Sequence, residues 1–351
     1  MTTMKQVAQK AGVSVSTVSL VMNHRDEGRV KSSIAERVRQ VAKELGYRPN
    51  PFASSLRTSR TRILGFISEE VATTPYAGGI ILGAQDAASR LGYMMLIVST
   101  DGEAREADEI AALKRYGVDG FMYAKMSNRI THIPDELKNE PVVIVDATDA
   151  EGRVPSIVPD EIAIARDATK RLVQAGCKRI AYIGCSEPMI AQDLRKEGYR
   201  QILNESGIEY DERLTIEVLN DRPALREVRE LFLRERPDGF FCFNDARSWY
   251  VYECAARLGL TVGQDISVVG VDNHRLVAET FSPQLTTVEL PHYEMGFWSV
   301  CKLVSMIEGR IPNIAMPKTN ATIPPLDGPL QAKIHCTLLE KESVVDRSVL
   351  L

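Results

Sequence analysis

Residues 4–23, MKQVAQKAGVSVSTVSLVMN, constrain the fold of this chain more than any other stretch of its sequence. Thr3, with Gln6 three residues later, is the pattern of a capping box at the start of a helix. Gly12 can adopt the left-handed conformation that ends a helix, and Ser14 can cap the next one. The stretch therefore predicts two short helices joined by a tight turn. Such a helix–turn–helix is typical of DNA-binding domains, in which the second helix enters the major groove.

The second predicted helix has two different faces. Val18 and Val21 are spaced to point into a core. Its other side chains point elsewhere, and four of them lie near its start or on its outer side: Val15, Ser16, Ser19 and Leu20. This division favours a helix that packs on one side and contacts a partner on the other.

A third helix is predicted to start at Ser32 or Ser33, with Glu36 placed for a second capping box, and to stop at Gly46. Its apolar positions are Val38, Val41, Ala42 and Leu45. Three helices of this length can share one small core.

Residues 47–62, YRPNPFASSLRTSRTR, predict a hinge helix and linker. Pro49 and Pro51 break the preceding helix and suit the first turn of a new one. Ala53 and Leu56 then share one face of a helix too short to be stable alone. We expect it to form on DNA, beside its twin from a second subunit.

Charge is segregated along the chain. Residues 1–62 hold twelve Lys and Arg against four Asp and Glu, a net charge of +8, whereas the whole chain carries −4. The remaining 63–351 therefore carry −12. A basic head on an acidic body is expected when one domain neutralises phosphates and the other does not.

Length and composition limit the class of protein. A chain of 351 residues predicts two or three domains. We find no positively charged, apolar signal segment at the start and no apolar run of about 18 residues, so we expect a cytoplasmic protein without membrane contact. The six cysteines are scattered without zinc-site spacing, which favours buried thiols in a reducing compartment and no metal or other cofactor.

From residue 63 onward, short apolar runs alternate with amphipathic segments. Strands are predicted at 63–67, 93–99, 119–124, 141–147, 178–184, 238–243 and 266–272. Helices are predicted at 79–91, 104–116, 161–175, 191–206 and 246–258. Near-continuous apolar strands separated by helices indicate parallel sheets covered on both faces. Two such series in tandem imply two lobes, with a ligand cleft at the carboxyl ends of the strands.

Together the head, the PNPFASSL hinge and the two-lobed body resemble the LacI/GalR family of bacterial transcription regulators. Further motifs carry the resemblance: VPSIVPDEIAIARDATKRLVQAGCKRIAYIG (154–184), LRKEGY (194–199), FND (243–245), LGLTVGQDISVVGVDN (258–273) and SPQLTTVELP (282–291). The resemblance covers roughly residues 3 to 325.

The resemblance implies an all-α helix-turn-helix head and an α/β two-lobed, periplasmic-binding-protein-like body with parallel sheets. The expected parts are a DNA-binding head (1–46), the hinge (47–62), an effector-binding and dimerisation domain (63–340) and a tail (341–351). It implies a homodimeric repressor on a palindromic double-stranded operator. A small-molecule effector in the interlobe cleft would shift the affinity of that dimer for DNA.

For the DNA-binding residues, the resemblance implies two groups in the head. Val15, Ser16 and Leu20 would read base edges, while Thr17 and Asn23 support the helix against phosphates or within the head's own fold. Leu20 cannot donate a hydrogen bond, so its best partner is a thymine methyl; the alternative for Leu20 is a core contact.

In the hinge, Leu56 matches a leucine that wedges into the minor groove, with Asn50 and Ala53 alongside. The alternative for Leu56 is packing under the body.

In the body, the resemblance places Arg195, Asn244 and Asp272 in the cleft. Asp146 and Tyr76 match further ligand positions, although capping or dimer packing is an open alternative for both. Asp272 could instead cap a helix. The guanidinium of Arg195, the amide of Asn244 and the carboxylate of Asp272 suit a ligand with many hydroxyl groups or a polar heterocycle. This set favours a sugar or sugar phosphate as the first choice of effector and a nucleobase as the second. Asp245 is expected to be a helix cap only.

Several departures from the family pattern lie near the expected cleft mouth. They are Ser68-Glu69-Glu70, Lys125, and Asn273 followed by His274. They leave the identity of the effector open.

Other classes of function fit the sequence less well. We find no nucleophile–base constellation, P-loop, GxGxxG after the first strand, or metal spacing, so an enzyme is not expected. A transport receptor outside the cytoplasm would need a signal segment and no basic head. A head that binds DNA constitutively, above a cleft without ligand, stays open.

Overall fold

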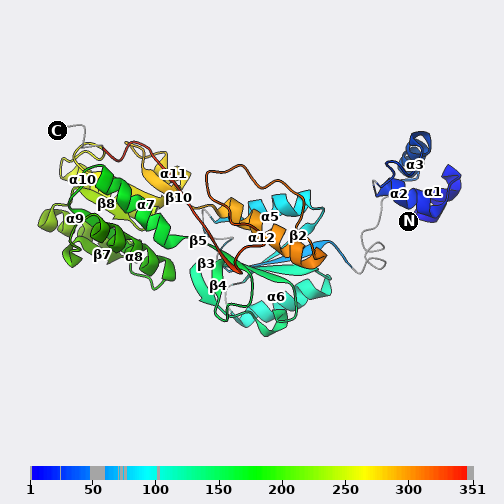
Figure 1. The fold of residues 1–351 in the computed structure, drawn as a ribbon, viewed down its shortest axis with the longest axis horizontal. Coiled ribbons are helices and arrows are strands. Elements are labelled where there is room, and N and C mark those ends of the chain that lie inside the picture. Colours follow the sequence, from blue (N-terminus) through cyan, green and yellow to red (C-terminus); the bar gives the residue numbers. More distant parts are fainter. Residues whose placement is uncertain are drawn as a thin grey trace. The chain divides into compact units, whose positions relative to one another are not determined.

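The structure is a computed structural model that describes residues 2–23, 25–47, 60–69, 71, 74, 77–100 and 103–345. The chain forms two compact units, Met1–Thr61 and Arg62–Leu351. Figure 1 shows both units and labels many of their elements. The predicted hinge residues Asn50, Ala53 and Leu56, and the predicted ligand residue Tyr76, lie outside the described residues.

The head contains three helices: α1 (Met4–Ala11), α2 (Val15–Met22) and α3 (Ser32–Glu44). Both halves of the capping box at Thr3 and Gln6 are present, and Gly12 ends α1 with a left-handed φ of 64°. The Ser14 hydroxyl accepts a hydrogen bond from the Thr17 backbone N–H at 3.1 Å, as the prediction of a cap requires. The shared core consists of Val7, Ala8, Ala11, Val18, Val21, Ala35, Val38, Val41 and Ala42.

The second capping box, predicted around Glu36, does not form. Because Lys31 is the N-cap of α3, the third helical position is Ile34 rather than Glu36. Glu36 is thus too far into the helix to reach back to the cap, and Lys31 makes no side-chain cap hydrogen bond.

The body consists of two six-stranded sheets, one in each lobe. The first has the order β11-β5-β4-β3-β1-β2 and the second β12-β10-β9-β8-β6-β7. The first-lobe strands are β1 (Ile63–Glu69), β2 (Met94–Thr100), β3 (Gly120–Thr131), β4 (Val142–Asp149), β5 (Ser156–Pro159) and β11 (Gln331–Ile334). The second-lobe strands are β6 (Ile180–Cys185), β7 (Thr215–Val218), β8 (Gly239–Cys242), β9 (Ser267–Asp272), β10 (Thr286–Glu289) and β12 (Thr337–Leu339). All paired strands are parallel except β10 and β12.

Helices cover the sheets of both lobes. In the first lobe these are α5 (Gly78–Arg90), α6 (Glu103–Arg115) and α12 (His292–Glu308), with a short 3-10 helix η1 (Asp135–Leu137). In the second lobe they are α7 (Glu161–Gln174), α8 (Ile190–Glu205), α9 (Arg222–Glu235), α10 (Asp245–Arg257) and α11 (Arg275–Ala278), with η2 (Glu212–Leu214). Each strand and helix predicted for the body is found, most within a few residues of its expected bounds. The largest difference is β3, which runs to Thr131 past a register shift between Ala124 and Arg129.

The lobes are not simply arranged in tandem, because the chain returns to the first lobe after β10. There α12 packs against α5, and the two helices lie side by side in Figure 1. Their approach requires glycine: a Cβ on Gly83 would lie 1.9 Å from the Tyr293 carbonyl oxygen, and one on Gly296 would lie 2.0 Å from that of Ile80. β11 then joins the first sheet and β12 the second. The short strands β5, β7, β10, β11 and β12, the helices α9, α11 and α12, and the 3-10 helices η1 and η2 were not predicted.

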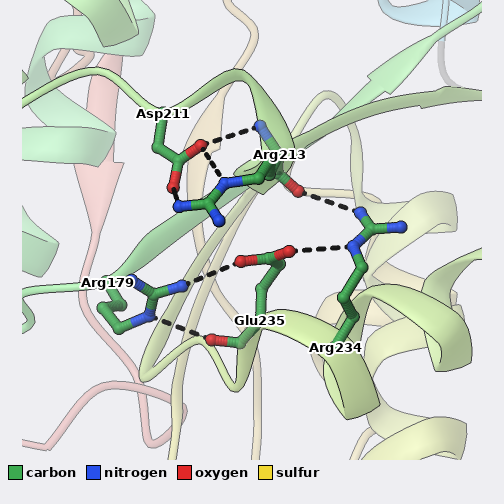
Figure 2. Close-up of polar contacts among 5 residues, drawn as sticks. All are labelled: Arg179, Asp211, Arg213, Arg234 and Glu235. Atoms are coloured by element: carbon green, nitrogen blue, oxygen red, sulfur yellow. Dashed lines mark hydrogen bonds and ion pairs between the residues drawn. The ribbon is translucent and has the colours of Figure 1, made fainter.

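A polar network joins the end of α9 to neighbouring segments of the second lobe (Figure 2). Glu235 accepts a hydrogen bond from Arg179 Nη2 at 3.1 Å and from Arg234 Nε at 2.8 Å. Arg234 Nη2 also donates to the Arg213 carbonyl oxygen at 3.2 Å, and Arg213 binds both oxygens of Asp211. Since the Glu235 carboxylate is buried, these bonds compensate its loss of water.

All six cysteines are free and buried, as their spacing predicted: Cys177, Cys185, Cys242, Cys254, Cys301 and Cys336. Among the described helices, none is both long and apolar enough to cross a membrane. The described part of the C-terminal segment packs on the second lobe, where the Ser343 hydroxyl donates to the Val268 carbonyl oxygen at 2.6 Å.

Candidate functional site

Two of the three side chains predicted to read bases are exposed at the start of α2. Val15 and Ser16 are exposed, and Leu20 is half-buried without belonging to the buried core of the head. The half-buried Thr17 hydroxyl lies 2.9 Å from that of Ser14. Asn23 ends α2 and its Nδ2 donates to the Ser19 carbonyl oxygen at 2.7 Å. Thr17 and Asn23 therefore help to shape the helix that presents Val15, Ser16 and Leu20.

A cavity of about 430 Å³ lies between the two lobes of the body. Four of the predicted ligand residues line it together: Asp146, Arg195, Asn244 and Asp272. They come from both lobes, and Asp272 ends strand β9, where the side chain can reach the cleft. The structure thus places in one cleft four residues that are up to 126 positions apart in the sequence.

Arg195 is buried on α8 and already has two partners. Its Nε donates to Glu161 Oε2 at 2.6 Å, and its Nη1 donates to the Phe243 carbonyl oxygen at 2.5 Å. Its guanidinium also lies 4.5 Å from the centre of the Phe243 ring. Burial raises the pKa of Glu161, although the charge of Arg195 and its hydrogen bond oppose this shift. The pair therefore brings both charges into the cleft wall.

Asn244 and Arg247 form a second buried unit at the start of α10. Asn244 is the N-cap, and its Oδ1 accepts from both the backbone N–H and Nη1 of Arg247, at 3.1 and 3.2 Å. Arg247 Nε donates to the Gly184 carbonyl oxygen at 3.1 Å, and Nη2 contacts Cys185 Sγ at 2.9 Å and the Val218 carbonyl oxygen at 3.1 Å. Asn244 can thus offer a ligand its amide N–H groups, because its oxygen is engaged.

The prediction that Asp245 is a helix cap is wrong. Asn244 occupies the cap position, so Asp245 is the first residue of α10 and is completely buried. Its Oδ2 accepts from the His274 backbone N–H at 2.8 Å and its Oδ1 from the Thr287 hydroxyl at 2.6 Å. Burial raises the pKa of Asp245 to about 7, while the Thr287 hydrogen bond works in the opposite direction. Asp245 therefore joins α10 to the strands behind the cleft.

Asp272 makes no helix cap either. The N-cap of the following helix α11 is His274, which has no side-chain cap hydrogen bond. Asp272 has an unusual backbone φ of 114° at the end of β9. Burial, followed by the negative charge of Asp245, raises the pKa of Asp272 well above its usual range.

The backbone of Asp146 on β4 is left-handed, with a φ of 53°. Asp146 faces a bulge of β3 in which Ser127 and Asn128 have φ values of 66° and 56°. Its Oδ2 accepts from the Ser127 backbone N–H at 3.1 Å. Burial and the charge of Glu161 raise the pKa of Asp146 to about 7, against the effect of the two backbone N–H groups.

Two of the residues that departed from the family pattern, Glu69 and Lys125, belong to a separate cluster in the first lobe, whereas Asn273 and His274 follow β9 in the second lobe. Lys125 is buried, pairs with Glu69 and lies 3.2 Å from Glu106 Oε1. The Tyr123 hydroxyl donates to the same Glu106 oxygen at 2.8 Å. These side chains line a second cavity of about 590 Å³, which shares Arg129 with the interlobe cleft. Lys125 thus lies next to the cleft and not among its lining residues.

The sequence reasoning missed several polar residues of the cleft: Glu161, Cys185, Glu187, Asn220, Arg247 and His292. Glu161 ends the motif PDE and Arg247 ends the motif FNDAR. Each lies in the first turn of a predicted helix that follows a strand. This position is the one detectable signal, because the carboxyl end of a parallel strand and the start of the next helix face the ligand side of a sheet.

Two family models match the chain. Residues 3–50 match "Bacterial regulatory proteins, lacI family", and residues 61–327 match "Periplasmic binding proteins and sugar binding domain of LacI family". The chain is 33% identical to the HTH-type transcriptional regulator RegA of Clostridium saccharobutylicum, over 87% of this chain and 92% of that protein. It is 28% identical to the sucrose operon repressor of Escherichia coli, over 90% and 98% of the two chains.

A solved structure of the transcriptional regulator CelR with cellobiose is 28% identical and has a TM-score of 0.65. That match covers 98% of this chain and 100% of the CelR chain. The fold, the head and the relatives agree: the chain belongs to the LacI family of bacterial regulatory proteins and is a DNA-binding transcriptional regulator, not an enzyme.

Proposed function

We propose that this regulator represses transcription as a homodimer. We propose further that a sugar, bound in the interlobe cleft, controls its affinity for the operator. The observation that carries the proposal is the single cavity of about 430 Å³ that Asp146, Arg195, Asn244 and Asp272 line together. Its volume is within the range of small-molecule sites, and its polar groups converge from two lobes.

The chemistry of the lining favours a hydroxyl-rich ligand. Asn244 offers N–H donors, whereas Asp146 and Asp272 offer carboxylate acceptors. A sugar hydroxyl can donate and accept at once, so it can pair with both kinds of group. Two relatives support this choice by name, since one was solved with cellobiose and the other is called a sucrose operon repressor.

Control of DNA binding would arise from the arrangement of the lobes. A ligand that contacts both lobes stabilises the arrangement in which both sets of contacts are made. It changes operator affinity only if it binds one arrangement more tightly than the other. Phe243 and Leu290 provide apolar surface in the same cleft, against which a sugar ring can pack.

On the DNA side, we propose that Val15, Ser16 and Leu20 contact base edges. The exposure of Val15 and Ser16 at the start of α2 supports this role. The proposed hinge contact of Leu56, with Asn50 and Ala53, rests on the sequence alone.

Two exposed apolar side chains support the homodimer. Met94 is 56% exposed on the edge strand β2, and Leu82 is 60% exposed on the adjacent helix α5. Isolated apolar side chains are common on surfaces, but two on neighbouring elements at a sheet edge favour a partner. A second copy of the chain also gives the two-fold symmetry that a palindromic operator needs.

The proposal is tested by fluorescence anisotropy with a labelled fragment of the protein's own promoter region, titrated with and without each member of a sugar panel. We expect specific binding that falls steeply with salt, and at least one sugar that changes the operator Kd. Asp272→Asn should remove the sugar response and leave operator binding intact. Asp211→Asn, in the second lobe but away from the cleft, is the matched control and should respond as the wild type does.

Two results would contradict the proposal. No preference for the promoter over random DNA would remove the operator role. Specific binding that no sugar changes would instead indicate a regulator that binds DNA constitutively.

A further inference from the structure

Both buried guanidinium groups of the cleft are already engaged within the protein. Arg195 gives Nε to the Glu161 carboxylate and Nη1 to the Phe243 carbonyl oxygen. Arg247 gives its nitrogens to two backbone carbonyls, to Cys185 and to the Asn244 oxygen. A phosphate group is normally bound by a guanidinium that offers two parallel N–H groups. Arg195 keeps only Nη2 without a partner among the described residues, and Arg247 keeps no such nitrogen, so neither arginine offers a ligand two free nitrogens.

The acceptors of the cleft are engaged much less. Asp146 accepts through Oδ2 from the bulge of β3, and no described residue donates a hydrogen bond to the Asp272 side chain. Glu187 adds a further carboxylate to the lining. The cleft therefore presents more acceptors than donors, which suits a ligand with many hydroxyl groups.

Carboxyl groups also outnumber guanidiniums around the cleft. Four carboxyl groups line the cleft (Asp146, Glu161, Glu187 and Asp272) with Asp245 directly behind, and the lining holds three guanidiniums, those of Arg129, Arg195 and Arg247. Burial raises the pKa values of Asp146 and Asp245 to about 7, and the negative charge of Glu161 adds to the shift of Asp146. An additional anion would meet this excess of carboxyl groups, and each of the three guanidiniums already has a protein partner, which is Glu69 in the case of Arg129.

We propose that the cleft selects an uncharged polyhydroxyl effector and excludes phosphorylated ones, and that Glu161 is the residue that makes this distinction by holding Arg195 in an ion pair. This inference rests on the proposed function. Glu161 acts through Arg195, so it is a positioning residue whose effect appears in selectivity.

The test compares matched sugars by isothermal titration calorimetry of the full-length protein. The pairs are glucose and glucose 6-phosphate, fructose and fructose 6-phosphate, sucrose and sucrose 6-phosphate, and cellobiose and cellobiose 6-phosphate, with inorganic phosphate as a further probe. For any sugar that binds, we expect the phosphate ester to bind at least about 100-fold more weakly, because an unpaired like charge in a desolvated site costs several kcal/mol. We define binding in the cleft as the part of the measured heat that the Asp272→Asn variant loses. Inorganic phosphate should give no such heat.

Glu161→Gln keeps an oxygen for Arg195 Nε and removes one negative charge. We expect it to reduce the preference for the neutral sugar from about 100-fold to about 10-fold or less, in line with the loss of one of the charges that repel the ester. Glu235→Gln is the matched control, because Glu235 is also buried and also binds arginines, in the network of Figure 2 and outside the cleft lining. Its selectivity should equal that of the wild type.

A phosphate ester that binds as tightly as its sugar, or an unchanged preference in Glu161→Gln, would overturn this inference and leave the proposed function standing. If no sugar of either kind gives heat or changes operator affinity, the proposed function fails and this inference falls with it.

Discussion

Asp146→Asn is expected to make the protein more stable at pH 8 while weakening effector binding. The carboxyl is 4% exposed, and burial, together with the charge of Glu161, raises its pKa from an ordinary 3.8 to about 7. The unfolded chain therefore releases the Asp146 proton near pH 4, whereas the folded protein holds it until about pH 7. Between these values the folded state binds more protons, so the contribution of Asp146 to stability falls as pH rises.

At pH 8 the full cost of the buried charge is present. Three pKa units at about 1.4 kcal/mol each correspond to an upper limit of about 4 kcal/mol. Asparagine keeps an oxygen for the Ser127 N–H and tolerates the left-handed φ of 53°. Its added amide costs about 1–3 kcal/mol if it finds no acceptor, so the expected net gain is about 1–3 kcal/mol at pH 8. At pH 4.5 the gain should vanish.

The assay is urea denaturation followed by circular dichroism at pH 4.5, 6 and 8. Asp149→Asn is the matched control on the same strand. Asp149 Oδ2 accepts hydrogen bonds from the backbone N–H groups of Arg153 at 2.6 Å and Val154 at 3.0 Å. Hydrogen bonds to a charged acceptor are stronger than those to a neutral one, so the substitution weakens both. That variant should be less stable at pH 8. A loss of stability in Asp146→Asn at pH 8, or a change equal at all three pH values, would refute the reasoning.

Three further predictions concern packing, the polar network and DNA. Gly83→Ala should lower the free energy of unfolding by about 1–3 kcal/mol in thermal melts, because its Cβ would lie 1.9 Å from the Tyr293 carbonyl oxygen. Gly78→Ala is the control and should leave stability unchanged, because a Cβ at Gly78 meets open space. Glu235→Ala should cost about 1–3 kcal/mol in urea denaturation by leaving two arginines without their shared partner; an unchanged midpoint would contradict this role. Leu20→Ala should weaken operator binding at one base-pair step only, and a uniform loss across all operator variants in anisotropy titrations would exclude a base contact.

Local features of the fold could be predicted because their causes lie within a few residues. The capping box of α1 needs only Thr3 and Gln6, and its glycine stop follows directly. The apolar runs of the seven predicted strands were equally visible, whereas the short strands β5, β7, β10, β11 and β12 were missed. The box at Glu36 was misjudged because a shift of the helix start by one or two residues changes which side chain lies at the third position.

The cleft could be predicted only in part. Arg195, Asn244 and Asp272 were assigned through family resemblance, and they do line one cavity. The partner of Arg195 could not be found, since Glu161 is 34 residues away and the pair exists only after α7 and α8 pack together. The role of Asp245 was missed for the same reason, because its acceptor bonds lead to Thr287 and His274 on other elements.

The return of the chain to the first lobe has a consequence for synthesis on the ribosome. The first lobe needs α12 and β11, which end at residue 334, and the second needs β12, which follows at once. Each lobe therefore stays incomplete, with the sheet edge or helix face that its missing element would cover left open, until nearly the whole chain has emerged. Nascent body chains that stop before residue 290 lack parts of both lobes. Such intermediates expose apolar surface and are the stage at which chaperones would be needed.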